Sequence, residues 1–188
     1  MKLSKESRYA IEGLLVLAKE QPSTIMQLKD IARAVGLSEG ALYRHFESKD
    51  ELVWKAFERH YVDFAATLQR LAENEPTARG KVAAMIRGFC QAHDENPILF
   101  RFLVFTQHGQ LGRLAETTPT PVSVMRAVIE RGIASGEIPK QEPDLATAFV
   151  FGVVLEPVQF AASGRLPSDM NAICERLIAA AWAAITTA

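Results

Sequence analysis

The sequence predicts an all-α protein of about nine helices, because apolar residues recur at the three-to-four-residue interval of an amphipathic helix. Such intervals run through most of the 188 residues. Signals that begin or end helices separate the stretches, among them Pro22, Gly36 and the pair Thr120 and Pro121. One short apolar run, ILFRFLVF at residues 98–105, is short enough for a strand but has no partner strand elsewhere. It is therefore expected to be helical.

The first helix is expected from about Lys5 to Lys19, and Pro22 follows its end. Residues 27–52, QLKDIARAVGLSEGALYRHFESKDEL, then predict two short helices joined by a tight turn. Gly36 suits the left-handed residue that follows many helices. Ser38 suits the cap of the next helix, because its hydroxyl accepts a free amide proton of the first turn.

The second of these short helices, at about residues 39–46, has one packed side and one thin polar side. Leu42 and Phe46 hold it against its neighbours, whereas Gly40 and Ala41 add almost no bulk to the other side. Such a helix meets the requirements for entering a DNA major groove. Further along, Ser48 and Glu51 form the S-x-x-E capping box of the following helix.

Six further helices are expected, and the 97–107 helix should be deeply buried because it is apolar almost all round. Polar loops are expected at 73–77 and 108–121, and Ser168 is expected to cap the last helix. The domain prediction is a three-helix DNA-binding domain at 1–48 and a helical ligand-binding and dimerisation domain at 49–188. The expected helices cover about 49–71, 77–93, 97–107, 121–135, 143–164 and 168–185.

Composition limits the possible functions. The net charge is −1, and residues 1–60 carry 10 Lys and Arg against 9 Asp and Glu. DNA binding must therefore use a few well-placed groups rather than a diffuse basic surface. No uninterrupted apolar run suggests a membrane span, and the first residues lack a secretory pattern, so a cytoplasmic location is expected. Cys90 and Cys174 are expected to be buried free thiols.

Two groups of apolar residues are candidates for binding surfaces. Aromatic and methionine side chains suit either the core or an effector pocket, and Glu156, before the helix-breaking Pro157, is the unusual polar residue near them. Small residues on the last two helices allow close helix approach and favour a homodimer interface. The candidate effector residues are Phe57, Phe64, Met85, Phe89, Phe105, Met125, Phe149, Glu156, Gln159 and Phe160, and the candidate dimer residues are Ala148, Gly152, Ala172, Ala179 and Ala183.

The run IARAVGLSEGALYRHFESKDEL resembles the DNA-binding signature of the TetR (tetracycline-repressor) family of regulators. LYRHF followed by S-K-x-x-L is its distinctive part. The resemblance implies that Tyr43, His45 and Lys49 meet the DNA backbone, with Tyr43 also near base edges. It places Ser38, Glu39, Gly40, Ala41 and Arg44 on the recognition helix, and Gln27 and Lys29 near the start of the helix before it.

The expected function is that of a ligand-responsive regulator, most simply a repressor. It binds a palindromic DNA operator as a homodimer and is released by a small apolar or amphipathic effector. A non-sensing architectural DNA-binding protein is the alternative. The opening residues are also similar to a winged-helix family of iron–sulfur regulators, but the clustered cysteines of that family are missing. No catalytic group, metal site or cofactor is expected.

Overall fold

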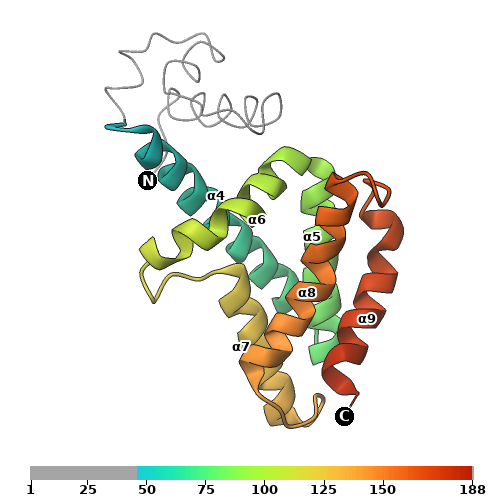
Figure 1. Cartoon of the computed structure of the whole chain (residues 1–188). Coiled ribbons are helices and arrows are strands. Elements are labelled where there is room, and N and C mark those ends of the chain that lie inside the picture. The colour runs from blue at the N-terminus through green and yellow to red at the C-terminus, as the bar shows by residue number, and fades with distance from the viewer. Residues whose placement is uncertain (1–45, 188) are drawn as a thin grey trace. The chain divides into compact units, whose positions relative to one another are not determined.

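The computed structural model describes residues 46–187, and every regular element among them is a helix (Figure 1). The all-α prediction is thus confirmed for this part of the chain. The predicted helices at 5–19, 27–35 and 39–46 lie outside the described residues, apart from Phe46 itself. The elements are α4 (Lys49–Glu73), α5 (Ala78–Glu95), α6 (Pro97–Gln110), η1 (Leu111–Arg113), α7 (Pro121–Ser135), α8 (Pro143–Ala162), η2 (Asn171–Ile173) and α9 (Cys174–Thr186).

The described residues form two compact units. The first comprises residues 46–60 and 98–115, and the second comprises 61–97 and 116–187. In the second unit α5 packs against α7 and α9, and α8 packs against α7 and α9 (Figure 1). The predicted domain division between residues 48 and 49 stays a prediction.

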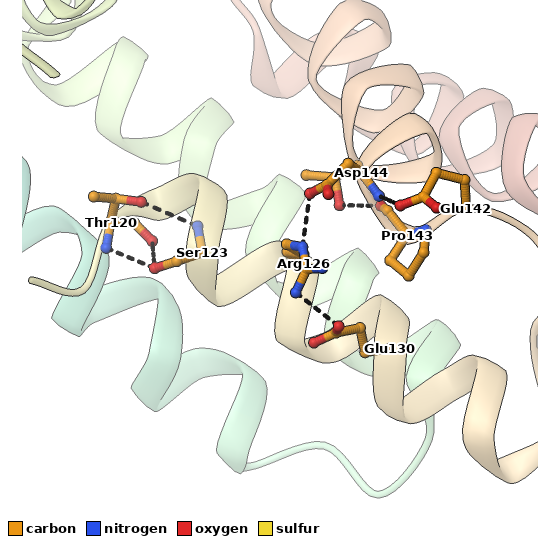
Figure 2. A network of polar contacts seen from close by, with 8 residues as sticks. Thr120, Ser123, Arg126, Glu130, Glu142, Pro143 and Asp144 are labelled. Atoms are coloured by element: carbon orange, nitrogen blue, oxygen red, sulfur yellow. Dashed lines mark hydrogen bonds and ion pairs between the residues drawn. The ribbon is translucent and has the colours of Figure 1, made fainter. Parts of the chain in front are cut away.

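Local chemistry fixes the ends of α7. Thr120 and Ser123 form a reciprocal capping box, in which each backbone N–H donates to the other side chain at 3.0 and 2.8 Å (Figure 2). At the other end Gly136 has φ 81°, a left-handed conformation that glycine adopts without strain. Both ends agree with the sequence prediction, because each depends on neighbouring residues only.

Arg126 then joins α7 to the beginning of α8. Its Nε lies 2.6 Å from Asp144 on α8 and its Nη1 lies 2.7 Å from Glu130 on α7 (Figure 2). The hydrogen bond to Asp144, partly opposed by desolvation, raises the pKa of Arg126. Both acidic partners are exposed, so this network positions the two helices and adds little stability of its own.

Part of the core of the second unit lies between α5 and α7. Met85, Met125 and Ile129 are fully buried there. Gly132 permits the closest approach, because a Cβ added to it would lie 2.6 Å from Ile138 Cδ1 and 2.9 Å from Ala78 Cβ. A side chain at residue 132 would therefore push these elements apart.

The prediction that α6 is deeply buried is wrong for most of its described side chains. Phe100 and Leu103 are buried, but Phe102 and Val104 are only half-buried and Arg101 is exposed. An apolar stretch without a clear stripe does not say how much of the helix surface the rest of the chain can cover.

The predicted cap of the last helix is also wrong. Ser168 precedes a short 3-10 turn, η2, which leads into α9; α9 has no side-chain cap, and Asp94 at the end of α5 caps η2 instead. Its carboxylate accepts hydrogen bonds from the backbone N–H of Met170 at 2.9 Å and from that of Asn171 at 2.8 Å. The Asn171 side chain and His93 also contact it, at 2.7 and 2.9 Å. One side chain of α5 thus fixes where the last segment begins.

The two cysteines are buried free thiols, as predicted. Cys90 on α5 and Cys174 at the start of α9 are hydrogen-bonded neighbours, and burial raises the pKa of each thiol. A buried thiol that resists ionisation is a poor nucleophile.

Neither thiol is expected to react with a thiol-specific disulfide reagent while the protein is folded. Both should react once guanidinium chloride unfolds the chain, because only then are they exposed and free to ionise. The absorbance of the coloured product that the reagent releases measures how many thiols have reacted. Rapid modification of either cysteine in the folded protein would contradict the burial seen here.

Candidate functional site

The first turn of α4 lies directly after the predicted DNA-binding segment and is tied down by its own side chains. The Ser48 hydroxyl accepts from the Glu51 backbone N–H at 3.1 Å, as the predicted capping box requires. The Glu51 carboxylate returns to the backbone N–H of Glu47 rather than to that of Ser48, and it pairs with Lys55 at 2.6 Å. The hydrogen bonds from Lys55 and Glu47 lower the pKa of Glu51.

A second contact joins this part of α4 to the segment after α6. Arg113 of η1 lies 2.9 Å from an oxygen of Asp50, and its guanidinium lies 4.6 Å from the ring centroid of Trp54. Gln110 also accepts from it at 3.0 Å. The exposed ion pair of Arg113 with Asp50 contributes little stability alone. The stacking of the guanidinium on the Trp54 ring adds to it. All of these residues belong to the first unit, so η1 is fastened to the first two turns of α4.

The predicted DNA-contacting residues lie outside the described residues, except for the backbone of Lys49. That backbone begins α4. The side chain of Lys49 is not among those described. The set outside the description is Gln27, Lys29, Ser38, Glu39, Gly40, Ala41, Tyr43, Arg44 and His45.

The predicted effector residues differ in burial, and Phe64 is half-buried. Phe57, Met85 and Met125 are fully buried and Phe89 is 5% exposed. The ring of Phe89 meets that of Phe64 edge to face, with centroids 5.0 Å apart. It meets Phe151 in the same way at 5.6 Å, a contact that the sequence prediction missed. The side chain of Phe105 lies outside the description.

The remaining four predicted effector residues are exposed on α8. Phe149 and Phe160 are 44% and 41% exposed. Glu156 and Gln159 are exposed as well, and the Gln159 amide donates to the Glu156 carboxylate at 3.0 Å. These four side chains are therefore exposed, unlike those of Phe57 and Phe89. Their role in effector binding stays a prediction.

The residues predicted for a dimer interface are all exposed in the protomer. A Cβ added to Gly152 would meet no atom within 4 Å. Leu145 and Phe149 lie on the same helix and are 51% and 44% exposed. Residues 143–161 of α8 are long and apolar enough to cross a membrane by length and composition, and only 28% of that stretch is buried. The exposed predicted residues are Ala148, Gly152, Ala172, Ala179 and Ala183.

A cavity of about 590 Å³ lies elsewhere in the second unit and shares no residue with the predicted sets. The end of α4, Lys81 of α5, the loop at 116–119 and one face of α7 line it. Its residues come from four separated segments, so no local motif indicated it. The nearest signal in the sequence is Arg131, which follows the apolar Val124 and Val128 at helical spacing. Among the described residues no cluster of three or more His, Cys, Asp or Glu side chains suits a metal ion.

Comparison with known proteins gives a consistent result. Residues 14–55 match the sequence profile of the bacterial regulatory proteins of the tetR family. A fatty acid metabolism regulator protein of Bacillus subtilis (strain 168) is 26% identical over 138 residues, which cover 70% of this chain and 71% of that protein.

Solved structures show the same fold. The fatty acid degradation regulator FadR from Bacillus halodurans superposes with a TM-score of 0.81 at 14% identity, covering 97% of each chain. The regulator FadR from Bacillus subtilis, solved in complex with stearoyl-CoA, has a TM-score of 0.78 at 18% identity and covers 95% of this chain and 98% of its own. Residues 14–55 thus match the tetR-family signature, and the chain shares its fold with these solved regulators.

Proposed function

We propose that the protein is a homodimeric repressor, which binds a palindromic DNA operator and leaves it when a fatty acyl thioester binds. The observation that carries the proposal is the family match at residues 14–55, because it spans every predicted DNA-contacting residue from Gln27 to Lys49. A protein of this family in bacterial cytoplasm has direct access to DNA, which supports the predicted location.

On the DNA side, a few well-placed contacts must suffice, because residues 1–60 are nearly neutral. Tyr43, His45 and Lys49 would bind phosphates, while Gly40 and Ala41 allow the recognition helix to approach the base edges. Two copies would place their recognition helices in successive major grooves, about 34–36 Å apart.

The contacts at the start of α4 support transmission of an effector signal. Lys49 is the first residue of α4. Asp50 follows it on the same turn, Trp54 lies on the next turn, and Arg113 contacts both. A shift of η1 would therefore act on the turn that carries a DNA contact. An effector changes operator binding only if it binds the two conformations with different affinities.

The homodimer is supported by the exposed apolar surface of α8 and the small residues of α9. A surface of this kind on a soluble regulator is usually covered by another chain. Gly152 and Ala148 on α8, with Ala179 and Ala183 on α9, let a second copy approach closely. In a two-fold dimer the same residues serve both subunits.

An acyl thioester is the effector class that the relatives favour. One relative is a fatty acid metabolism regulator, and a structural neighbour was solved with stearoyl-CoA. The aromatic contacts of Phe89 with Phe64 and Phe151 supply apolar surface in the helical body. Such surface suits an acyl chain.

Alanine at Tyr43 or at Lys49 is expected to weaken operator binding by about tenfold while the dimer persists, since each change removes one phosphate contact. The operator is first selected from random DNA, and affinity is then measured by fluorescence anisotropy at several salt concentrations. For Lys49→Ala the slope of log affinity against log salt should fall by about one. Lys140→Ala, on an exposed loop residue, is the matched control.

Undiminished binding by both variants at physiological salt would reject the DNA-contact assignment. Steep salt dependence without any sequence preference would instead favour the alternative function, an architectural DNA-binding protein. For the effector, stearoyl-CoA added to the preformed complex should release the operator, whereas an unchanged complex would contradict an acyl-thioester response.

A further inference from the structure

The cavity in the second unit has the size of a small-molecule site. Its volume of about 590 Å³ lies within the range of roughly 300–1,000 Å³ found for such sites. One wall is a single face of α7, on which Val124, Val128 and Arg131 recur at intervals of four and three residues. The two valines are 9% and 1% exposed and form an apolar floor. The capping box at Thr120 and the bonds of Arg126 to α8 hold this wall in place (Figure 2).

Two cationic side chains border the cavity, and each has N–H donors that no described residue accepts. Arg131 is exposed and has no hydrogen bond or ion pair with any residue that the structure describes. Its planar guanidinium suits two oxygens of one phosphate or carboxylate. Lys81 donates from Nζ to the Ala72 carbonyl at 2.9 Å, which leaves two of its three N–H groups for another acceptor.

Two carboxylates, three hydroxyls (those of Thr117, Thr118 and Ser123) and the Gln69 amide complete the polar lining. Glu116 has no partner among the described residues, and Glu73 accepts from the Gln69 amide at 2.8 Å. Thr117 and Thr118 each offer a hydroxyl that donates and accepts. Two positive and two negative side chains cancel, so the cavity is not a site for a bare anion. It suits a molecule that combines an anionic group with amide or amino N–H donors.

We propose that this cavity binds the polar part of the effector, a phosphate-bearing group that also carries amide N–H donors. The coenzyme A half of an acyl thioester has this chemistry, and the inference rests on the proposed function for the thioester itself. Arg131 and Lys81 bind phosphate oxygens, and Glu116 accepts an N–H. The floor of two valines and small residues is too limited for a long acyl chain, which must lie in another part of the protein.

The test is calorimetric titration of the full-length protein with stearoyl-CoA and, separately, with coenzyme A and with stearate. Arg131→Ala is expected to weaken binding of stearoyl-CoA and of coenzyme A by about tenfold, because a charge-assisted hydrogen bond is lost. Stearate affinity should not change. Arg79→Ala is the matched control, since Arg79 is exposed on α5 but does not line the cavity. Arg131 is exposed, so its removal leaves the fold intact, which circular dichroism checks.

The results separate this inference from the proposed function. If Arg131→Ala binds stearoyl-CoA and coenzyme A as tightly as the wild type, the cavity is not the site of the polar group, while the thioester response stands. Wild-type protein that binds stearate and stearoyl-CoA equally and ignores coenzyme A overturns the inference as well. Wild-type protein that binds no stearoyl-CoA rejects the thioester part of the proposed function itself.

Discussion

Gly152→Arg is expected to turn the proposed dimer into a monomer. Within the protomer the substitution causes no clash at the Cβ, because a Cβ at Gly152 has no neighbour within 4 Å, and the residue is exposed. Replacing a glycine inside a helix even favours that helix slightly. The effect must therefore come from a second copy. A two-fold axis brings two added charges into the proposed interface, and a hundredfold or greater loss of dimer affinity is expected, equivalent to at least about 2.7 kcal/mol.

Sedimentation velocity over a range of protein concentrations measures this change, and operator binding should fall with it. Gly109→Arg is the matched control, because Gly109 is also a helical glycine with open space around its Cβ. It should remain dimeric. A Gly152→Arg protein that sediments as the wild type does would show that α8 is not the interface, and wild-type protein found in membranes would redirect attention to the apolar length of this helix.

Asp94→Ala is expected to destabilise the fold by about 2–3 kcal/mol, because it removes a charged acceptor from two backbone N–H groups and leaves one of them partly buried. Asp94 holds residues 170 and 171 from a position 76 residues earlier in the chain. Asp169→Ala is the matched control, since Asp169 caps the same segment only locally, through the Ala172 N–H at 3.1 Å. That variant should lose less than about 1 kcal/mol. Chemical denaturation measures both, and equal losses would contradict a special role for Asp94.

The Asp94 carboxylate also makes the stability of the fold depend on pH. Burial has the largest single influence and raises the pKa of Asp94, but hydrogen bonds from His93, Met170 and Asn171 outweigh it and hold the pKa below its usual 3.8. A group with a lowered folded pKa stabilises the fold above its unfolded pKa, and this contribution disappears as pH falls through the folded pKa. The stability difference between wild type and Asp94→Ala should therefore be full at neutral pH and shrink below about pH 4.

Helix boundaries were predictable where neighbouring residues determine them. Thr120, Pro121 and Gly136 act within a single turn, so α7 begins and ends where the sequence indicates. The start of the last segment, η2, was not predictable, because Asp94 reaches it from another helix and no spacing in the sequence records that contact. The burial of α6 failed for a related reason, since exposure depends on which surfaces the rest of the chain covers.

The candidate sites also differ in whether neighbouring or distant residues form them. A DNA-binding motif is contiguous, so LYRHF and its flanking residues were enough to indicate the family that residues 14–55 match. A cavity is not contiguous, and Lys81, Glu116 and Arg131 meet only after four segments have packed. Aromatic content also failed to separate interior from surface, because Phe89 is buried whereas Phe149 on α8 is exposed. Side-chain type alone does not fix burial.

The exposed face of α8 also bears on how much protein a cell must make. If a second copy covers Leu145 and Phe149, the dimer forms by mass action and its concentration rises with the square of the protomer concentration while protomers are in excess. Operator occupancy would then respond to expression level more steeply than it would for a monomeric regulator. Dilution during growth would by itself relieve repression, without any effector.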